Sequence, residues 1–201
     1  MLRMYTEKPA EGGLLEEDVN DIPSSPVKPV VPVEDLFKKH ATEEGQIFAK
    51  GLVLFLRDLS ALEFGKGIKF SLESCRSLIT MIDRTASGSL SFLETVKGWK
   101  EIKAYKKIFE QFDKDGSGSV NTYELGKLFG ALGFAVKKQV QIAIVRRYGN
   151  RKNEITLVDF LIVIFKLTMM YDIFKQKQSK TGSTDSASFT MSEFLCYTMY
   201  C

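Results

Sequence analysis

The stretch Asp113-Lys-Asp-Gly-Ser-Gly-Ser-Val-Asn-Thr-Tyr-Glu124 decides how this chain folds. Its oxygen-bearing residues have the spacing of a twelve-residue calcium loop, in which positions 1, 3, 5, 7 and 12 supply ligands. These positions are Asp113, Asp115, Ser117, Ser119 and Glu124. Calcium is a hard cation that takes about six to eight oxygens, so carboxylates, a hydroxyl and the Ser119 carbonyl suit it. We therefore predict one Ca²⁺ ion at this loop.

Apolar residues at helical spacing flank the loop on both sides. Before it, residues 92–112 carry apolar side chains at steps of three or four: Phe92, Val96, Trp99, Ile102, Tyr105, Phe109 and Phe112. After it, Leu125, Leu128 and Phe129 begin a second helix. A helix on each side of a calcium loop is the EF-hand motif.

A second loop with the same spacing runs from Asp83 to Glu94. Its candidate ligands are Asp83, Thr85, Ser87, Ser89 and Glu94, with Gly88 at the turn. This loop offers two carboxylates where the loop 113–124 offers three, so we predict that any calcium binding there is weak. A structural loop without calcium is the preferred alternative.

Five apolar centres recur along the chain and indicate five units of this kind. They are Ile47, Leu90, Val120, Ile155 and Phe189, at intervals of 43, 30, 35 and 34 residues. The loop at 149–154 carries cations in place of acids, and the last loop, 178–188, has Asp185 as its one acid, so we predict that neither binds calcium. The pattern predicts an all-α fold of paired helix–loop–helix units with short strands joining the loops.

Composition divides the chain at about residue 33. All five prolines lie in the first 32 residues, which are acidic and lack apolar periodicity, whereas residues 33–201 are mildly basic and helical in pattern. We predict an extended linker over 7–32 and a calcium-binding domain over 33–201. The net charge of +3 does not call for nucleic acid, and no apolar stretch has the roughly 18 residues of a membrane span. Three cysteines without CxxC spacing favour the cytoplasm.

Several stretches of the chain match a known family. They are Phe70-Ser-Leu-Glu-Ser-Cys75-Arg-Ser, Thr122 to Leu125, Ala131 to Phe134, Val145-Arg-Arg-Tyr148 and Phe174-Lys-Gln176. These stretches resemble the penta-EF-hand domain at the C terminus of a calpain large subunit. Leu2 to Ala10 similarly resembles the last strand of the C2-like domain that precedes it. The resemblance implies that residues 1–32 are the end of that domain and an acidic, proline-rich linker, and that 33–201 form a penta-EF-hand domain.

The resemblance also bears on the first unit. In that family the first loop takes calcium through an alanine carbonyl, two acids and a closing glutamate. The corresponding positions here are Ala41, Glu44, Gln46 and Gly51. Gly51 has no carboxylate with which to close the site, so the resemblance implies an atypical calpain whose first site is inactive.

An odd fifth unit has no partner within the chain for its strand and helices. It would expose an apolar surface of the kind that marks an interface, made by Met191, Phe194, Leu195, Tyr197, Thr198 and Met199. The resemblance implies a homodimer, or a heterodimer with a calpain small subunit, through this surface. The alternative is a terminal helix that folds back on its own core.

The residues also argue against catalysis in this segment. A calpain cleaves peptides with a Cys, a His and an Asn in a separate papain-like domain. This chain has one histidine, His40, which we expect on an exposed helix face, and no cysteine with a catalytic local sequence. We predict a non-catalytic, calcium-binding, dimerising regulatory domain; the parent chain resembles a calcium-dependent cysteine protease with catalytic and C2-like domains. Two alternatives stay open: a freestanding penta-EF-hand adaptor for target peptides, and a calcium-independent dimerisation scaffold.

Overall fold

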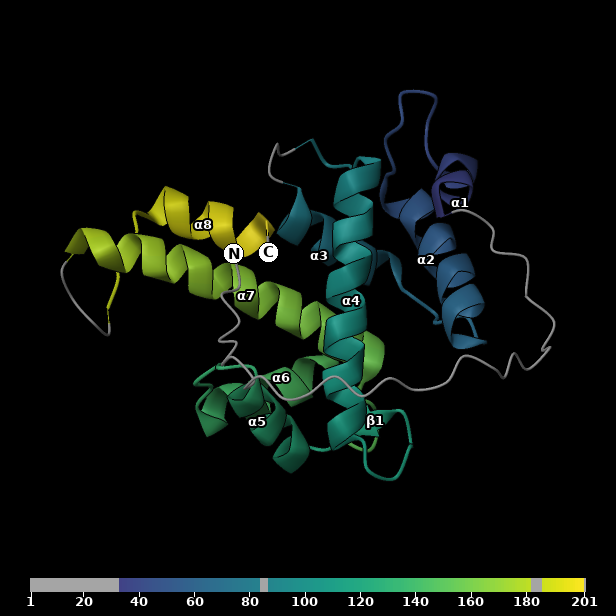
Figure 1. Ribbon diagram of the computed structural model, residues 1–201. Coiled ribbons are helices and arrows are strands. Elements are labelled where there is room, and N and C mark those ends of the chain that lie inside the picture. Colours follow the sequence, from purple (N-terminus) through teal and green to yellow (C-terminus); the bar gives the residue numbers. More distant parts are fainter. Residues whose placement is uncertain (1–32, 84–86, 182–185, 201) are drawn as a thin grey trace, which may run out of the picture. The chain divides into compact units, whose positions relative to one another are not determined.

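The structure is a computed structural model that describes residues 33–83, 87–181 and 186–200. Over these residues the chain is mainly helical, with two short strands (Figure 1). The helices are α1 Val33–His40, α2 Ala49–Phe64, α3 Leu72–Ile82, α4 Phe92–Phe112, α5 Thr122–Ala131, α6 Lys138–Tyr148, α7 Leu157–Thr181 and α8 Met191–Tyr200. The strands are β1 Ser119–Val120 and β2 Ile155–Thr156. The all-α prediction is confirmed.

Some of the sequence predictions lie outside the described residues. The strand within Leu2 to Ala10 and the linker over 7–32 belong to the first 32 residues. Thr85 and Asp185, in the second and fifth loops, lie outside as well. The domain boundary at residue 33 therefore stays a prediction.

The long helix α4 has the bounds that its apolar spacing predicts. Ser91 caps its first turn, because the Ser91 side chain accepts a hydrogen bond from the Glu94 N–H and the Glu94 carboxylate accepts one from the Ser91 N–H. Trp99 and Phe109 are buried on one face of the helix. Phe109 contacts Phe160 of α7, with ring centroids 5.5 Å apart. Helix α4 therefore joins the calcium-loop region to the core.

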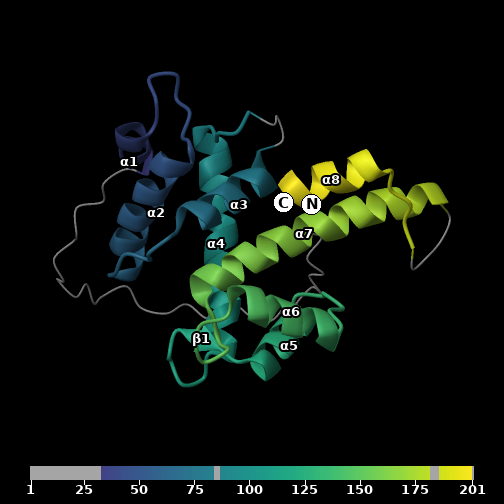
Figure 2. The same ribbon diagram turned by 180° about the vertical axis from the view of Figure 1, so that it is seen from behind.

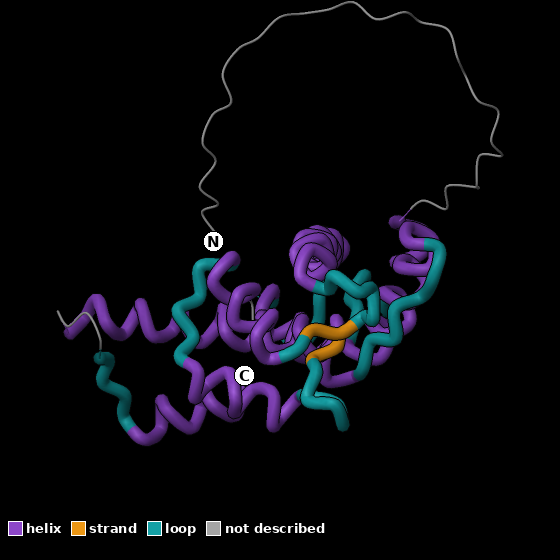
Figure 3. Tube along the Cα trace, turned by 90° about the horizontal axis from the view of Figure 1, so that it is seen from below, coloured by secondary structure: helices purple, strands orange, loops and turns teal. Residues whose placement is uncertain are grey.

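The loops pair two by two through main-chain hydrogen bonds. Strands β1 and β2 are antiparallel, with Val120 opposite Ile155 (Figure 3). Ile47 and Leu90 form an isolated antiparallel bridge, in which their N–H and C=O groups bond at 2.8 and 3.0 Å. All four side chains are fully buried. The first unit therefore pairs with the second and the third with the fourth, which confirms the predicted loop–loop strands.

The four paired loops share one backbone turn, two residues before the pairing residue. The angle φ is +71° at Gly45, +76° at Gly88, +79° at Gly118 and +60° at Asn153. Glycine adopts this left-handed conformation without steric cost, and asparagine is among the few other residues that visit it. Acid-rich and acid-poor loops thus have the same turn, and the difference between them lies in their side chains.

Helix α7 contributes a run of buried residues, 160–165, to the core and packs against α3. Helix α8 runs alongside α7 in both views (Figures 1 and 2). An ion pair between Lys177 of α7 and Glu193 of α8 joins the two helices. Within the described part of the chain, no helix has the length and apolar character needed to cross a membrane.

Candidate calcium site

The loop 113–124 folds around the carboxylate of Asp113. This residue follows the last residue of α4, and its Oδ2 accepts a hydrogen bond from the Gly118 N–H at 2.9 Å. The positive φ of Gly118 turns the chain back toward the end of the helix and so makes this bond available. The same turn brings the Ser117 hydroxyl close to Asp113.

Oxygen atoms from three ligand positions lie as close together as the ligands of one ion. Ser117 Oγ is 3.3 Å from Asp113 Oδ1 and 3.1 Å from the carbonyl oxygen of Ser119. With calcium–oxygen distances of about 2.4 Å, neighbouring ligands at roughly right angles are about 3.4 Å apart. Positions 1, 5 and 7 of the loop therefore already have ligand spacing.

Asp115, at position 3, adds a second carboxylate. Its Oδ1 accepts a hydrogen bond from the Ser117 N–H at 3.1 Å. This backbone hydrogen bond, together with the Ser117 side chain, lowers the pKa of Asp115 below its ordinary value. Because the side chain is also exposed, Asp115 is ionised at neutral pH and open to an approaching cation.

Glu124, at position 12, points to the start of α5 instead of to the other ligands. Its Oε2 accepts a hydrogen bond from the Asn121 N–H at 3.0 Å, and Asn121 Oδ1 accepts one from the Glu124 N–H at 3.1 Å. This capping box begins α5. Accordingly, no group of three or more His, Cys, Asp or Glu side chains that could hold a metal occurs within residues 33–83, 87–181 and 186–200. Glu124 Oε2 is thus bonded at the start of α5, while Asp113, Ser117 and Ser119 lie together in the loop.

The loop 83–94 repeats this arrangement with fewer charges. Ser87 Oγ lies 3.3 Å from Asp83 Oδ2, like the serine and aspartate of the loop 113–124. The closing residue, Glu94, accepts two hydrogen bonds from Ser91, from its N–H at 3.0 Å and from its hydroxyl at 2.8 Å. Two bonds hold the Glu94 carboxylate where one holds that of Glu124, so recruiting Glu94 to an ion costs more.

The first loop is tightly packed at Gly51, where the resemblance places its closing ligand. A Cβ atom on Gly51 would lie 2.4 Å from the His40 carbonyl oxygen and 3.1 Å from Ile47 Cγ1. A glutamate does not fit there unless α1 and α2 separate. Gln46, another of the implied ligands, accepts a hydrogen bond from the Ser89 hydroxyl at 3.1 Å and is engaged with the neighbouring loop.

In the fourth loop an amide organises the backbone. Asn150 Oδ1 accepts hydrogen bonds from the N–H groups of Lys152 and Glu154, at 2.8 and 3.1 Å. The side chains of Arg151 and Lys152 are exposed. This loop therefore keeps the shared turn while presenting cations to solvent, a poor environment for a metal ion.

The expectation of an exposed His40 is wrong. Its side chain is 9% exposed, and its Nε2 lies 3.1 Å from Oδ2 of Asp58 in α2. The reason is that α1 packs on α2, which brings the end of α1 over Asp58. Cys75 is buried, and burial raises the pKa of its thiol to about 12. The thiol is therefore protonated at neutral pH and a poor nucleophile.

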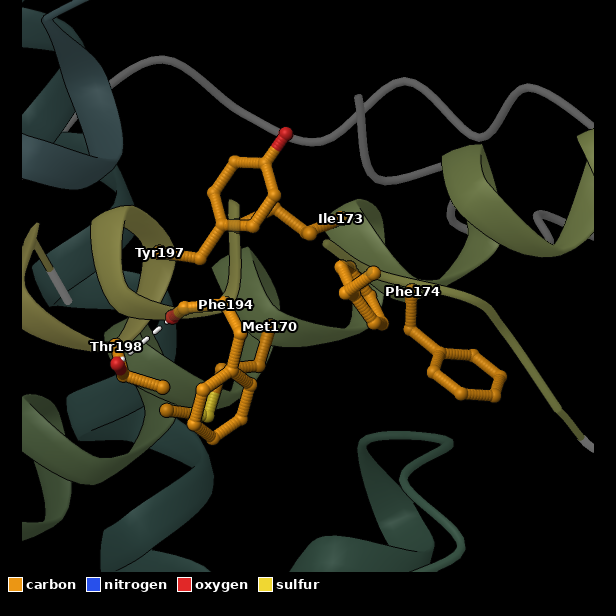
Figure 4. A pocket seen from close by; sticks show the side chains of 7 residues that line it. Met170, Ile173, Phe174, Phe194, Tyr197 and Thr198 are labelled. Carbon is orange, nitrogen blue, oxygen red and sulfur yellow. Dashed lines mark hydrogen bonds between the residues drawn. The ribbon is translucent and has the colours of Figure 1, made fainter. Parts of the chain in front are cut away.

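Helix α8 exposes most of the residues predicted for the interface. Met191, Phe194, Leu195 and Met199 are 73, 53, 50 and 83% exposed. Between α8 and α7 lies an apolar groove of about 310 Å³ (Figure 4). It is lined by Met170, Ile173, Phe174, Phe189, Phe194, Tyr197 and Thr198. Helix α8 thus lies beside α7 and leaves apolar side chains uncovered.

Comparisons with known proteins agree with this geometry. Residues 104–133, which include the end of α4, the loop and α5, match the EF-hand domain family. The Calpain-1 catalytic subunit of Mus musculus is 30% identical over 206 residues, covering 100% of this chain and 29% of that protein. The Calpain-1 catalytic subunit of Rattus norvegicus is 32% identical over 181 residues, covering 87% of this chain and 25% of that protein. The chain therefore spans less than a third of the length of these relatives.

A solved structure has the same fold. The homolog of programmed cell death 6 protein from Leishmania major Friedlin matches with a TM-score of 0.57 and 21% sequence identity. The match covers 79% of this chain and 86% of that one. The helices and paired loops described above are those of a penta-EF-hand fold.

Proposed function

The chain is a homologue of the C-terminal region of the calpain catalytic subunits, and we propose that it is the calcium-binding, dimerising, non-catalytic regulatory domain of a calpain-like cysteine protease. The observation that carries this proposal is the spacing of the oxygen atoms in the loop 113–124. Ser117 Oγ lies 3.3 Å from Asp113 Oδ1 and 3.1 Å from the Ser119 carbonyl oxygen, so three ligand positions of that loop lie close together.

The residues of this loop fit a calcium ion. Asp113, Asp115 and Glu124 offer carboxylates, Ser117 a hydroxyl and Ser119 a backbone carbonyl, and all are the hard oxygen donors that calcium prefers. Bound calcium would supply a double positive charge that neutralises the loop. The part of the protein is to hold positions 1, 5 and 7 in place and to release Glu124 from the cap of α5.

Release of Glu124 links the loop to helix packing. While capped, Glu124 ties the first turn of α5 to Asn121. The loop is also joined to the fourth unit through β1 and β2, so a shift of α5 acts on a paired unit. One site biases a conformational equilibrium only by its different affinity for the two states. We therefore expect a modest rearrangement of α5.

Helix α8 supplies the dimer surface in this proposal. Met191 and Met199 are more than 70% exposed, and burial of apolar surface is the dominant favourable contribution to most protein–protein association. Among the described residues, Phe189, the centre of the fifth unit, takes part in no strand pairing. The fifth unit is therefore available to pair with a second copy or with a calpain small subunit.

Peptide cleavage belongs to another part of the parent protein in this proposal. The Cys75 thiol is protonated, and the His40 imidazole is engaged with Asp58. The domain would act on the catalytic and C2-like domains of its parent chain, in the cytoplasm.

A calorimetric calcium titration tests the proposal. We expect one site per chain, lost in Glu124→Gln and retained in Glu94→Gln. The second variant is a matched control, because Glu94 caps α4 as Glu124 caps α5. If the wild-type chain binds no calcium, the sensor is refuted and a calcium-independent dimerisation scaffold remains, since both helix caps are complete without an ion.

A further inference from the structure

A hydrogen bond joins the loop 113–124 to a carboxylate of the fourth unit. Ser119 Oγ donates to Glu154 Oε2 at 3.0 Å and lies 3.2 Å from Ser117 Oγ. Ser117 Oγ in turn donates to Asp113 Oδ1. A continuous series of polar contacts therefore runs from Glu154 to the position 1 ligand of the loop.

The strand pairing places Glu154 beside the loop. Ser119 is directly opposite Thr156. Because side chains alternate along a strand, Glu154, two residues before Thr156, lies on the same face and diagonally across from Ser119. Within its own loop, Glu154 Oε2 also accepts a hydrogen bond from Asn150 Nδ2 at 3.3 Å. The carboxylate is thus oriented from both sides.

The first pair of loops contains the same bond with a neutral acceptor. Ser89 Oγ donates to Gln46 Oε1 at 3.1 Å and lies 3.2 Å from Ser87 Oγ. Gln46 and Glu154 occupy the same place in their loops, directly before the pairing residue. At this position the two halves of the domain therefore differ by one negative charge.

We propose that the negative charge of Glu154 strengthens cation binding by the loop 113–124, although Glu154 is not one of its ligands. Its charge acts on the loop through a side chain that Ser119 and Asn150 hold in place. Gln46 makes the equivalent bond without the charge, so the loop 83–94 lacks this contribution. The inference rests on the proposed calcium binding by the loop 113–124. It gives a function to the one acid of an otherwise basic loop.

The variant E154Q isolates the charge. A glutamine there keeps an acceptor for Ser119, as Gln46 does for Ser89. We expect the Kd for calcium to rise about three- to fivefold in 0.1 M KCl, the effect of one partly screened surface charge. In 1 M KCl the difference should shrink, because the Debye length falls to about 3 Å. The conservative variant E154D keeps the charge and should bind calcium much as the wild type does.

Thermal unfolding in EDTA shows that each variant folds, and we expect closely similar midpoints.

Two results would overturn the inference alone. One is a wild-type chain that binds calcium with an affinity that E154Q leaves unchanged. The other is a loss of affinity in E154Q that is equal at both salt concentrations, because a merely structural role does not depend on screening. If the wild-type chain shows no calcium binding that Glu124→Gln removes, the proposed function fails and this inference falls with it.

Discussion

Replacing Gly51 with alanine should destabilise the chain, whereas the same replacement at Gly130 should stabilise it. Gly51 lies in the first turn of α2, and Gly130 lies near the end of α5. A Cβ atom on Gly51 would lie 2.4 Å from the His40 carbonyl oxygen, but nothing lies within 4 Å of one on Gly130. The pair of variants therefore isolates the steric cost of a side chain in the first loop.

The magnitude follows from two opposed terms. Replacing a helical glycine with alanine gains about 0.5–1 kcal/mol, and both variants share this term. At Gly51 the gain is opposed by overpacking, which costs about 1–3 kcal/mol. The nearest atom belongs to the main chain of His40, and Ile47 Cγ1 lies 3.1 Å from the same Cβ, so rotating one side chain does not relieve the contact. We expect a net loss of about 1 kcal/mol for Gly51→Ala and a difference of about 1–3 kcal/mol between the variants.

Urea denaturation in EDTA, followed by circular dichroism, measures both changes without a contribution from calcium. With an m-value of about 1–3 kcal/mol per M urea, 1 kcal/mol corresponds to a shift in the urea midpoint of about 0.3–1 M. If the two variants agree within about 0.5 kcal/mol, the close packing at Gly51 is refuted. The same result would remove the argument that the first loop has no room for a closing glutamate. In support of that argument, Gly51→Glu should add no calcium equivalent in a titration.

Three further perturbations have defined outcomes. Calcium at about 100–1,000 times its Kd should stabilise the wild-type chain by about 3–4 kcal/mol. Glu124→Gln should lose this stabilisation and Glu94→Gln should keep it, as measured by denaturation with and without calcium. Equal losses in the two variants would contradict the assignment of the calcium site to the loop 113–124. Phe194→Glu and Met199→Glu should shift the chain toward monomer in sedimentation velocity. Leu93→Glu should not, because Leu93, although apolar and 78% exposed, lies on α4. An unchanged profile in the two α8 variants would refute the α8 interface. The α8 amides should lose protection from hydrogen exchange as the pH falls from about 4.5 to about 2. The hydrogen bond from Lys177 lowers the pKa of Glu193 from 4.5 to about 2. The ion pair therefore stabilises α8 fully above the unfolded pKa, and this stabilisation is lost as the carboxylate protonates. Glu193→Gln should show no such pH dependence, and an identical pH profile would argue against a role for this pair.

Local signals explain what could be predicted about the fold and the site. The ligand spacing from Asp113 to Glu124 depends on neighbouring residues, and the buried face of α4 depends on the helical period, so both are visible in the sequence alone. That the loops pair through short strands could also be predicted, because repeated units place equivalent apolar residues at regular intervals. The partner of each loop, as Ile155 for Val120, came from the structure. The ligand spacing and the buried face of α4 do not require knowledge of how distant side chains meet.

Contacts between distant segments, and in one case a competition between local partners, explain what could not be predicted. His40 reads as a surface residue until Asp58, eighteen positions away, is placed against it. The Glu124 carboxylate can bind either the Asn121 N–H or an ion, and the sequence of the loop is the same in both cases. The sequence therefore did not show that Glu124 caps α5. The obstruction at Gly51 exists because the end of α1 lies over α2.

By itself, the sequence determined the repeated helix–loop–helix pattern and the loop, 113–124, that has the ligand spacing of a calcium loop. That information is carried by residue types and short spacings, which act before distant parts of the chain meet. Only the tertiary structure decided which side chain of the neighbouring unit contacts each loop. Ser119 and Glu154 are 35 residues apart, as Ser89 and Gln46 are 43 apart, and they meet because strand pairing sets which side chains share a face.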